Sequence, residues 1–142
     1  MKTHIPCLIT YSEEDKCWYV KSPGFYSGIL TDGDSLEEAK VNAAEAVNGL
    51  LSVYLENSDD FSIPSDNAGK DWFNIEVNPN LAFSLWLKEM RIEKKMTLAD
   101  VANKLGIRYQ VYQKLENPKT SNPTLKTMAK LEKVFDTELL AI

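Results

Sequence analysis

The chain has 142 residues and a formal net charge of −5, from 16 Lys and Arg against 21 Asp and Glu. This length allows two small domains, each near the lower size limit for independent stability. No apolar run is long enough to cross a membrane, and the N-terminus lacks the charged, apolar and small-residue order of a signal peptide. We therefore expect a cytoplasmic protein with no membrane partner.

The charge is unevenly distributed along the chain. Residues 1–78 carry 5 basic and 14 acidic side chains, a net −9, whereas residues 79–142 carry 11 basic and 7 acidic side chains, a net +4. A basic region gains affinity for DNA by releasing counterions. An acidic region is repelled by phosphate and suits a basic partner. The sequence thus predicts two domains, 1–78 and 79–142, with different partners.

The N-terminal half begins with short strand patterns. Residues 5–11 and 16–21 are rich in apolar and aromatic side chains on either side of a polar turn, which predicts a hairpin. After a Ser-Pro-Gly break, we expect a third strand at 25–30 and a turn at 31–34. Pro6 is tolerated near the start of a strand. A small antiparallel sheet follows from this pattern.

A long helix and a last strand complete the first domain. Ser35 and Glu38 fit a capping box, in which each side chain accepts a hydrogen bond from the other residue's backbone amide. The helix is expected to run to about Leu55, and a polar loop to span 56–71. Alternation of apolar and polar residues predicts a strand at 72–77. The buried stripe of the helix is expected to comprise Leu36, Ala39, Ala43, Val47, Leu50, Leu51 and Tyr54.

The residue pattern favours a binding protein over an enzyme. Cys7 and Cys17 lack metal-ligand spacing and fall out of register in the predicted hairpin, so we expect free thiols of a reducing compartment. His4 is a lone histidine near a terminus, expected on the surface. Metal-dependent phosphoryl chemistry needs converging carboxylates. Here the acids cluster in turns and the loop, and the predicted strands are almost free of them, Glu76 excepted. No metal motif, phosphate loop or nucleophile–base arrangement appears, so we predict no catalysis and no cofactor.

The C-terminal half predicts short helices. The first spans 81–95 with Asn80 as its cap, and Thr97 caps the second, which buries one face up to Leu105. Gly106 lies where the chain must turn sharply before a further short helix that carries Val111, Tyr112 and Leu115 inward. Such a pair leaves one face of its second helix free for a major groove.

The last helix is expected to open at Asn122–Pro123, with Pro in its first turn. Its inward residues would be Leu125, Met128, Ala129, Leu131 and Val134. The apolar segment 139–142 closes the chain, and its side chains suggest either a subunit contact or closure of the small domain.

Along its whole length this half resembles the lambda-repressor-like (Xre-type) DNA-binding domains. In that family an Arg of the first helix pairs with a Glu that closes the recognition helix, and Arg91 and Glu116 fall on those positions. The resemblance implies a structural role for both, since removing one partner would strand the other charge.

The resemblance also assigns the DNA contacts. Tyr109, Gln110 and Lys114 fall on base-reading positions, where Gln can bond the edge of adenine and Lys that of guanine. Lys119 and Thr120 suit phosphate contacts that set the register, whereas Pro118 removes an amide donor from the same loop. The whole exposed face of the recognition helix is expected to comprise Arg108, Tyr109, Gln110, Gln113 and Lys114.

The order of elements across nearly all of the chain resembles the HicB antitoxin family. The matching features are the acidic hairpin turn, the aromatic strand at 18–20, the Pro-Gly turn, the helix opening at 31–39 and the later segments 63–65 and 75–77. This resemblance implies an α+β chain: a truncated, non-catalytic RNase H-like domain with one long helix, followed by an all-α lambda-repressor-like domain. It also implies neutralisation of a HicA-type RNA-cleaving toxin and repression of the shared operon.

The partners expected are thus a HicA-type toxin, operator double-stranded DNA and a second copy of the chain. One helix-turn-helix reads one half-site, so at least a dimer is needed for a palindrome, through the C-terminal helices or the N-terminal sheets. Charge suggests Glu13, Glu14 and Asp15 as toxin contacts, with apolar contacts near Trp18 or along a strand edge as the alternative. The rival interpretation is a stand-alone Xre-type repressor whose first domain binds a small ligand or mediates oligomerisation.

Overall fold

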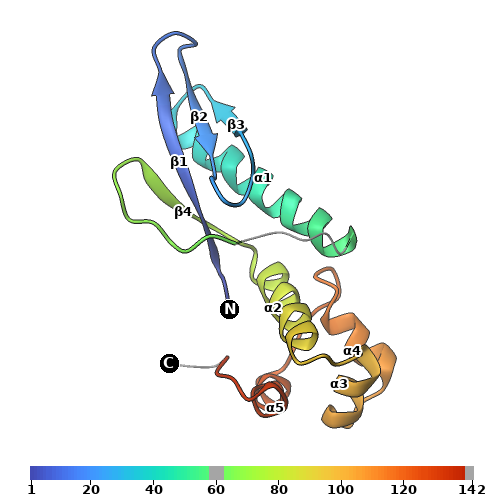
Figure 1. Ribbon diagram of the computed structural model, residues 1–142. Helices are drawn as coiled ribbons and strands as arrows, with labels where there is room; N and C mark the ends of the chain where they lie inside the picture. The colour runs from blue at the N-terminus through green and yellow to red at the C-terminus, as the bar shows by residue number, and fades with distance from the viewer. Residues whose placement is uncertain (58–62, 140–142) are drawn as a thin grey trace. The chain divides into compact units, whose positions relative to one another are not determined.

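A computed structural model describes residues 1–57 and 63–139. The chain folds as two compact units, Lys2–Asn78 and Pro79–Ile142. The first is a sheet with one helix and the second is helical (Figure 1). None of the described helices is long and apolar enough to span a membrane.

The first unit contains a four-stranded antiparallel sheet in the order β3-β2-β1-β4. A single helix, α1, lies along one face of this sheet (Figure 1). The predicted α+β architecture and hairpin are confirmed. The elements are β1 (His4–Ser12), β2 (Cys17–Lys21), β3 (Ile29–Gly33), α1 (Leu36–Asn57) and β4 (Trp72–Glu76).

The core of this unit lies between the sheet and α1. Ile5, Ile9 and Val20 are fully buried from the sheet. The helix contributes four residues of the predicted stripe, Ala39, Ala43, Val47 and Leu51, all fully buried as well. The approach is closest at Gly33, where an added Cβ would lie only 2.4 Å from the backbone nitrogen of Ala39.

The third strand differs from the prediction. We expected a strand at 25–30 and a turn at 31–34, but β3 begins at Ile29, and Thr31 pairs in register with Val20. Residues 22–28 instead form a loop with positive φ at Gly24 and Gly28. Phe25 is buried by an edge-on contact with Tyr54, with ring centroids 6.0 Å apart, rather than by strand pairing. The apolar and aromatic residues that predicted a strand here therefore include Phe25, which is buried from within a loop.

The start of α1 also departs from a full capping box. The Glu38 amide donates to Ser35 Oγ at 3.1 Å, as predicted, but the Glu38 carboxylate accepts from the amide of Asp34 at 3.3 Å rather than from that of Ser35. The expected loop at 56–71 differs at its start, because α1 continues to Asn57. Residues 58–62 of that loop, with the acids Asp59 and Asp60, lie outside the described residues.

Both cysteines are free thiols. Cys7 is buried in the centre of the sheet, opposite Phe73 of β4, and this burial raises the pKa of its thiol to about 11. Cys17 faces Ser12 across the hairpin, so the two cysteines occupy different positions along the paired strands.

The second unit consists of four helices in its described part. Its hydrophobic core contains an edge-on contact between Trp86 and Phe135, with ring centroids 5.9 Å apart. The expected helical spacing missed both aromatic residues and instead placed Leu125 and Ala129 inward, whereas both are exposed. The helices are α2 (Pro79–Glu93), α3 (Leu98–Leu105), α4 (Tyr109–Leu115) and α5 (Leu125–Phe135).

Two helix boundaries in this unit differ from the prediction. The first helix begins at Pro79 and ends at Glu93, two residues earlier than expected at each end. The last helix is capped by Thr124, whose hydroxyl accepts from the Thr127 amide at 3.1 Å, so Pro123 precedes the cap instead of lying in the first turn. At the C-terminus Leu139 packs against the core and helps to close the unit, while Leu140 and Ile142 lie outside the described residues.

Candidate nucleic-acid interface

The first helix of the predicted DNA-reading pair, α3, is fixed at its start by a complete capping box. The Asp100 amide donates to Thr97 Oγ1 at 3.1 Å, and the Thr97 amide donates to the Asp100 carboxylate at 2.8 Å. The backbone bond from Thr97, with the Thr97 hydroxyl as a smaller contribution, lowers the pKa of Asp100. Because two orphan amides at the helix start find acceptors, the start of α3 is well defined.

The turn between α3 and α4 depends on Gly106. This residue has φ of +71°, in the left-handed region, and its amide donates to the carbonyl of Asn103 at 3.1 Å. The next amide, of Ile107, donates to the carbonyl of Ala102 at 3.0 Å. These two bonds form a Schellman motif, which ends the helix and satisfies its last carbonyls. The chain then enters α4 directly after Arg108.

An ion pair joins α2 to the end of α4. Arg91 Nε and Nη2 donate to the two carboxylate oxygens of Glu116, at 2.8 and 3.1 Å, and Nη1 donates to the carbonyl of Met96 at 3.2 Å. The two side chains are only 16% and 9% exposed. The hydrogen bonds to Glu116 raise the pKa of Arg91. The structure therefore brings together the two residues that the family resemblance paired, and their geometry is bidentate.

A second link to α4 comes from a residue that sequence reasoning missed. Ser84 is fully buried within α2, and its hydroxyl donates to the carbonyl of Leu115 at 3.1 Å. The only sequence signal was a small polar residue in the apolar run 81–87. Two contacts from α2, one ionic and one neutral, thus hold the C-terminal end of α4.

These contacts leave one side of α4 facing solvent. Tyr112 and Leu115 are buried, and with about 100° between successive residues the position of Gln110 lies opposite them. Gln113 and Lys114 flank Gln110 on either side, and both are exposed. The predicted base-reading residues Gln110 and Lys114 are therefore adjacent on the helix surface, where their amide and ammonium groups can reach base edges.

The rim of this face contains the remaining α4 residues. Arg108 is exposed at the cap position and makes no side-chain capping bond. Tyr109 is 42% exposed. Val111 was predicted to point inward but is 48% exposed, because a helix of seven residues buries only the narrow side that carries Tyr112 and Leu115. An exposed valine on this face can contact a thymine methyl group, a role that sequence reasoning did not assign.

The loop after α4 uses its own amides internally. The Lys119 amide donates to Asn117 Oδ1 at 3.0 Å, and the amides of Thr120 and Ser121 donate to the Asn117 carbonyl at 3.0 and 2.8 Å. The Thr120 hydroxyl donates to the carbonyl of Lys114 at 2.8 Å. In this conformation Thr120 has no proton to offer a phosphate, so it serves to close α4. Lys119 is exposed in the same loop, and its ammonium group stays the predicted phosphate contact.

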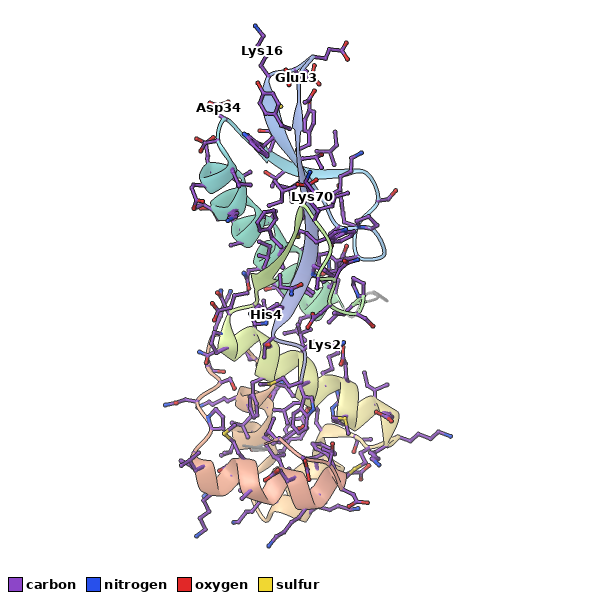
Figure 2. The ribbon with its side chains drawn as sticks, turned by 90° about the vertical axis from the view of Figure 1, so that its left-hand side faces the viewer. Lys2, His4, Glu13, Lys16, Asp34 and Lys70 are labelled. Atoms are coloured by element: carbon purple, nitrogen blue, oxygen red, sulfur yellow. The ribbon has the colours of Figure 1, made fainter. Side chains whose placement is uncertain are left out.

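The acidic hairpin expected to meet a toxin is exposed but partly engaged in its own turn. Figure 2 shows Glu13 and Lys16 at the tip of the β1–β2 hairpin with side chains that extend away from the sheet. Asp15 accepts a bond from the Tyr19 hydroxyl at 2.5 Å, which raises the pKa of Tyr19. Glu14 is exposed beside Asp15. The half-buried Trp18 packs edge-on against Tyr11 with ring centroids 5.3 Å apart.

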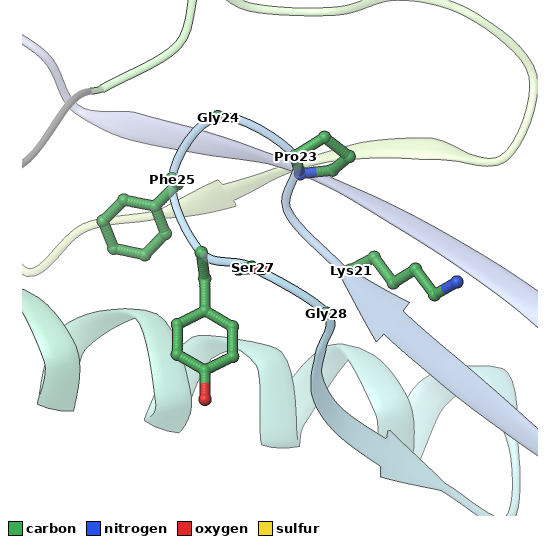
Figure 3. Close-up of a pocket in the computed structure, with 7 residues that line it drawn as sticks. Lys21, Pro23, Gly24, Phe25, Ser27 and Gly28 are labelled. Atoms are coloured by element: carbon green, nitrogen blue, oxygen red, sulfur yellow. The ribbon is translucent and has the colours of Figure 1, made fainter.

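The described residues do not gather a metal site. No three His, Cys, Asp or Glu side chains within 1–57 and 63–139 lie close enough to hold a metal ion. His4 is half-buried at the start of β1, opposite Glu76. A pocket of about 570 Å³ is lined by Lys21 and residues 23–28. Figure 3 shows the Lys21 side chain extending to one side of this loop and the Phe25 ring to the other, so charge and ring do not converge.

Comparison with known proteins defines the class of the C-terminal unit. Residues 87–142 match the helix-turn-helix family, and this stretch contains all of the α3–turn–α4 geometry. The C-terminal unit is therefore a DNA-binding helix-turn-helix domain of the kind found in transcription regulation. Among curated proteins, the chain is similar to "Multiprotein-bridging factor 1c" of Arabidopsis thaliana, with 27% identity over 134 residues, which cover 93% of this chain and 86% of the relative.

Proposed function

We propose that this protein is an antitoxin that represses its own operon. The helix-turn-helix unit binds operator DNA, and the acidic sheet unit binds and neutralises a basic, RNA-cleaving toxin of the HicA type in the cytoplasm. The observation that supports this most is the division of charge between the units: net −9 in residues 1–78 and +4 in residues 79–142. The order of elements in the first unit resembles that of HicB antitoxins, and this resemblance is the reason for proposing a HicA-type toxin as the partner.

In this proposal the first unit acts by covering its partner rather than by catalysis. Within the described residues, its acids lie in turns and at solvent-facing positions and do not converge. A truncated RNase H-like domain without its metal-binding carboxylates retains a surface for binding but no two-metal chemistry. The surface near Trp18 and the turn that carries Glu13, Glu14 and Asp15 are the proposed toxin contacts.

Operator recognition in this proposal divides α4 into two kinds of contact. Tyr109, Gln110 and Lys114 read bases, Val111 and Gln113 border them, and Arg108 and Lys119 hold phosphates. Two such units about one helical turn apart read a palindrome, so the active form is at least a dimer.

Binding to the chain's own promoter fragment and to random DNA tests the repressor half. Gln110→Ala should weaken operator binding by about 1–3 kcal/mol and leave binding to random DNA nearly unchanged. Lys119→Ala should weaken binding to both and reduce the salt dependence by about one charge. Lys16→Ala, which removes an equal charge from the hairpin tip, is the matched control and should change neither. Equal losses on both DNAs for Gln110→Ala would contradict base reading.

The antitoxin half requires a small basic reading frame immediately beside the gene, and co-expression with that frame tests it. We expect that frame to arrest growth alone, and this protein to restore growth and to co-purify with its product. Persistent arrest without a complex would overturn the antitoxin proposal and leave the DNA-binding class intact.

A second candidate is a stand-alone regulator without a toxin partner. It is favoured by the alignment over 134 residues with a relative whose name describes the bridging of proteins. In that case the sheet unit would bind another protein or a second copy while α4 binds DNA. A harmless neighbouring gene product, together with intact operator binding, would favour this candidate.

A further inference from the structure

The solvent side of α1 has an unusual composition for a helix that only covers a sheet. A ridge of residues spaced four apart, Glu37, Val41, Glu45, Gly49 and Val53, faces solvent along most of the helix. Val41 is 60% exposed and Val53 is 46% exposed. Glu56 adds a further exposed carboxylate near the end. Residues spaced four apart form the ridges with which helices pack against each other.

Gly49 interrupts this ridge near its middle. A Cβ built at Gly49 meets no atom within 4 Å, so nothing within the described chain requires a glycine there. In a helix interior, glycine is about 1 kcal/mol less favourable than alanine. A notch with exposed valines on both sides allows a second helix to approach closely. The acidic residues on the same ridge indicate that this second helix carries basic side chains.

The solvent side of α5 has the matching chemistry. Lys126, Lys130 and Lys133 are all exposed, at helical spacing, and lie opposite the buried Leu131 and Phe135. Between these lysines lies the small exposed Ala129, and Leu125 at the start of the helix is 73% exposed. The Glu132 carboxylate accepts from the Leu139 amide and lies off this stripe. The helix thus offers a basic surface with a small residue and one large apolar side chain.

We propose that α1 of one chain docks against α5 of a second copy, with Gly49 and Ala129 at the crossing point. Lysines of α5 then lie against glutamates of α1, and Leu125 packs beside an exposed valine. One 11-residue helix is about 16 Å long and buries too little surface for a stable dimer. Two reciprocal contacts related by a two-fold axis double that surface and pair two helix-turn-helix units.

This inference goes beyond the toxin and operator proposals, and its test uses the purified full chain alone. The mass of the protein is followed by analytical ultracentrifugation over a range of concentrations at low and high salt. We expect a dimer whose Kd rises at least tenfold between 50 mM and 500 mM salt, because exposed charge pairs are screened. A single-chain mass at all concentrations up to about 100 µM would overturn the proposal.

Charge reversal gives the sharpest test. Glu45→Lys with Glu56→Lys places lysines on both helices, and Lys130→Glu with Lys133→Glu places glutamates on both, so each variant alone should dimerise at least tenfold more weakly. An equal mixture restores both contacts, and a heterodimer should form with a Kd near that of the wild type. Glu13→Lys with Glu14→Lys, the same charge change at the hairpin tip, is the matched control and should not affect the dimer.

Two further results would overturn the proposal. One is a mixture of the two reversed variants that does not associate. The other is a Lys130→Glu, Lys133→Glu variant that loses DNA affinity but keeps the dimer. That result would show that these α5 lysines contact phosphate rather than a second chain. Gly49→Gln separates docking from folding: since glutamine favours helix more than glycine does, the unit should melt no lower than the wild type while Kd rises at least tenfold. An unchanged Kd in this variant would also contradict the crossing at Gly49.

Discussion

The two units differ in how far apart in the sequence their stabilising contacts lie. In the helical unit many side-chain hydrogen bonds join residues three or fewer positions apart, as in the Thr97–Asp100 and Thr124–Thr127 caps. Long-range hydrogen bonds join α2 to the end of α4. In the sheet unit, by contrast, the central strand β1 pairs with β4 more than sixty residues later. Local caps define where α3 and α5 begin, whereas long-range contacts hold the end of α4 and define the sheet.

The largest expected effect concerns the long-range ion pair of the helical unit. Arg91→Ala should destabilise that unit by about 3 kcal/mol, because the nearly buried Glu116 loses its partner. Urea unfolding followed by tryptophan fluorescence measures the change, because Trp86 lies in the helical unit and Trp18 and Trp72 lie in the sheet unit. The matched control is Glu37→Ala in the sheet unit, which breaks an exposed pair with Lys40 at 3.7 Å and should cost less than about 1 kcal/mol. Equal losses for the two variants would contradict the distinction between buried and exposed pairs.

The next effect compares a glycine from each unit. Gly33→Ala places a Cβ against the backbone of Ala39 and should destabilise the sheet unit by about 2–3 kcal/mol through overpacking. Gly106→Ala meets open space but keeps a φ of +71°, so it should cost only about 1 kcal/mol. Thermal unfolding of both variants tests the order. A larger loss at Gly106 would show that the turn, rather than close packing, is the more demanding position.

A smaller effect is expected for the local cap of α3. The pKa of Asp100 is lowered in the folded chain, so its contribution to stability is present above the unfolded pKa of about 4 and is lost as the pH falls through the lower folded value. The stability difference between the wild type and Asp100→Ala should therefore shrink on acidification from pH 5 to pH 2. A difference that stays constant with pH would show that the ionised carboxylate is not what stabilises the cap.

The smallest effect is expected at Tyr112. Its hydroxyl is buried and makes no hydrogen bond with the described residues, and burial, helped by the nearby Glu116 carboxylate, raises its pKa. Tyr112→Phe removes an unsatisfied polar atom but keeps the ring, so stability should change by less than about 1 kcal/mol or should rise. A loss above that value, measured by urea unfolding, would indicate that the hydroxyl is bound to Glu116 in solution.

Much of the helical unit could be predicted because its signals are local. The cap at Thr97, the turn at Gly106 and the exposed positions of Gln110 and Lys114 follow from residue types at fixed short spacings. The same reasoning failed for Leu125 and Val111, which it placed in the core. Helical spacing reports which residues share a side, but a short helix buries only the part of that side that its neighbours cover.

The sheet unit was predicted less well where packing overrides pattern. The expected strand at 25–30 contains Phe25, which is buried by Tyr54 of α1 from within a loop. The strand begins at Ile29 instead, where residues can pair with β2. No local signal distinguishes an aromatic residue buried by a helix from one buried by a strand. Local signals likewise did not decide whether the partner of this unit contacts the charged hairpin turn or the apolar residues near Trp18.

The amino-acid sequence by itself determined the α+β order of elements, the division of charge near residue 78 and the helix-turn-helix, since helix caps, turns and charges are encoded within a few neighbouring residues. Only the tertiary structure showed that Ser84 binds the end of α4, that the Thr120 hydroxyl is already used, and that Val41, Gly49 and Val53 form an open ridge. These properties depend on which surfaces neighbouring elements cover. Coverage is decided by packing between residues distant in the chain.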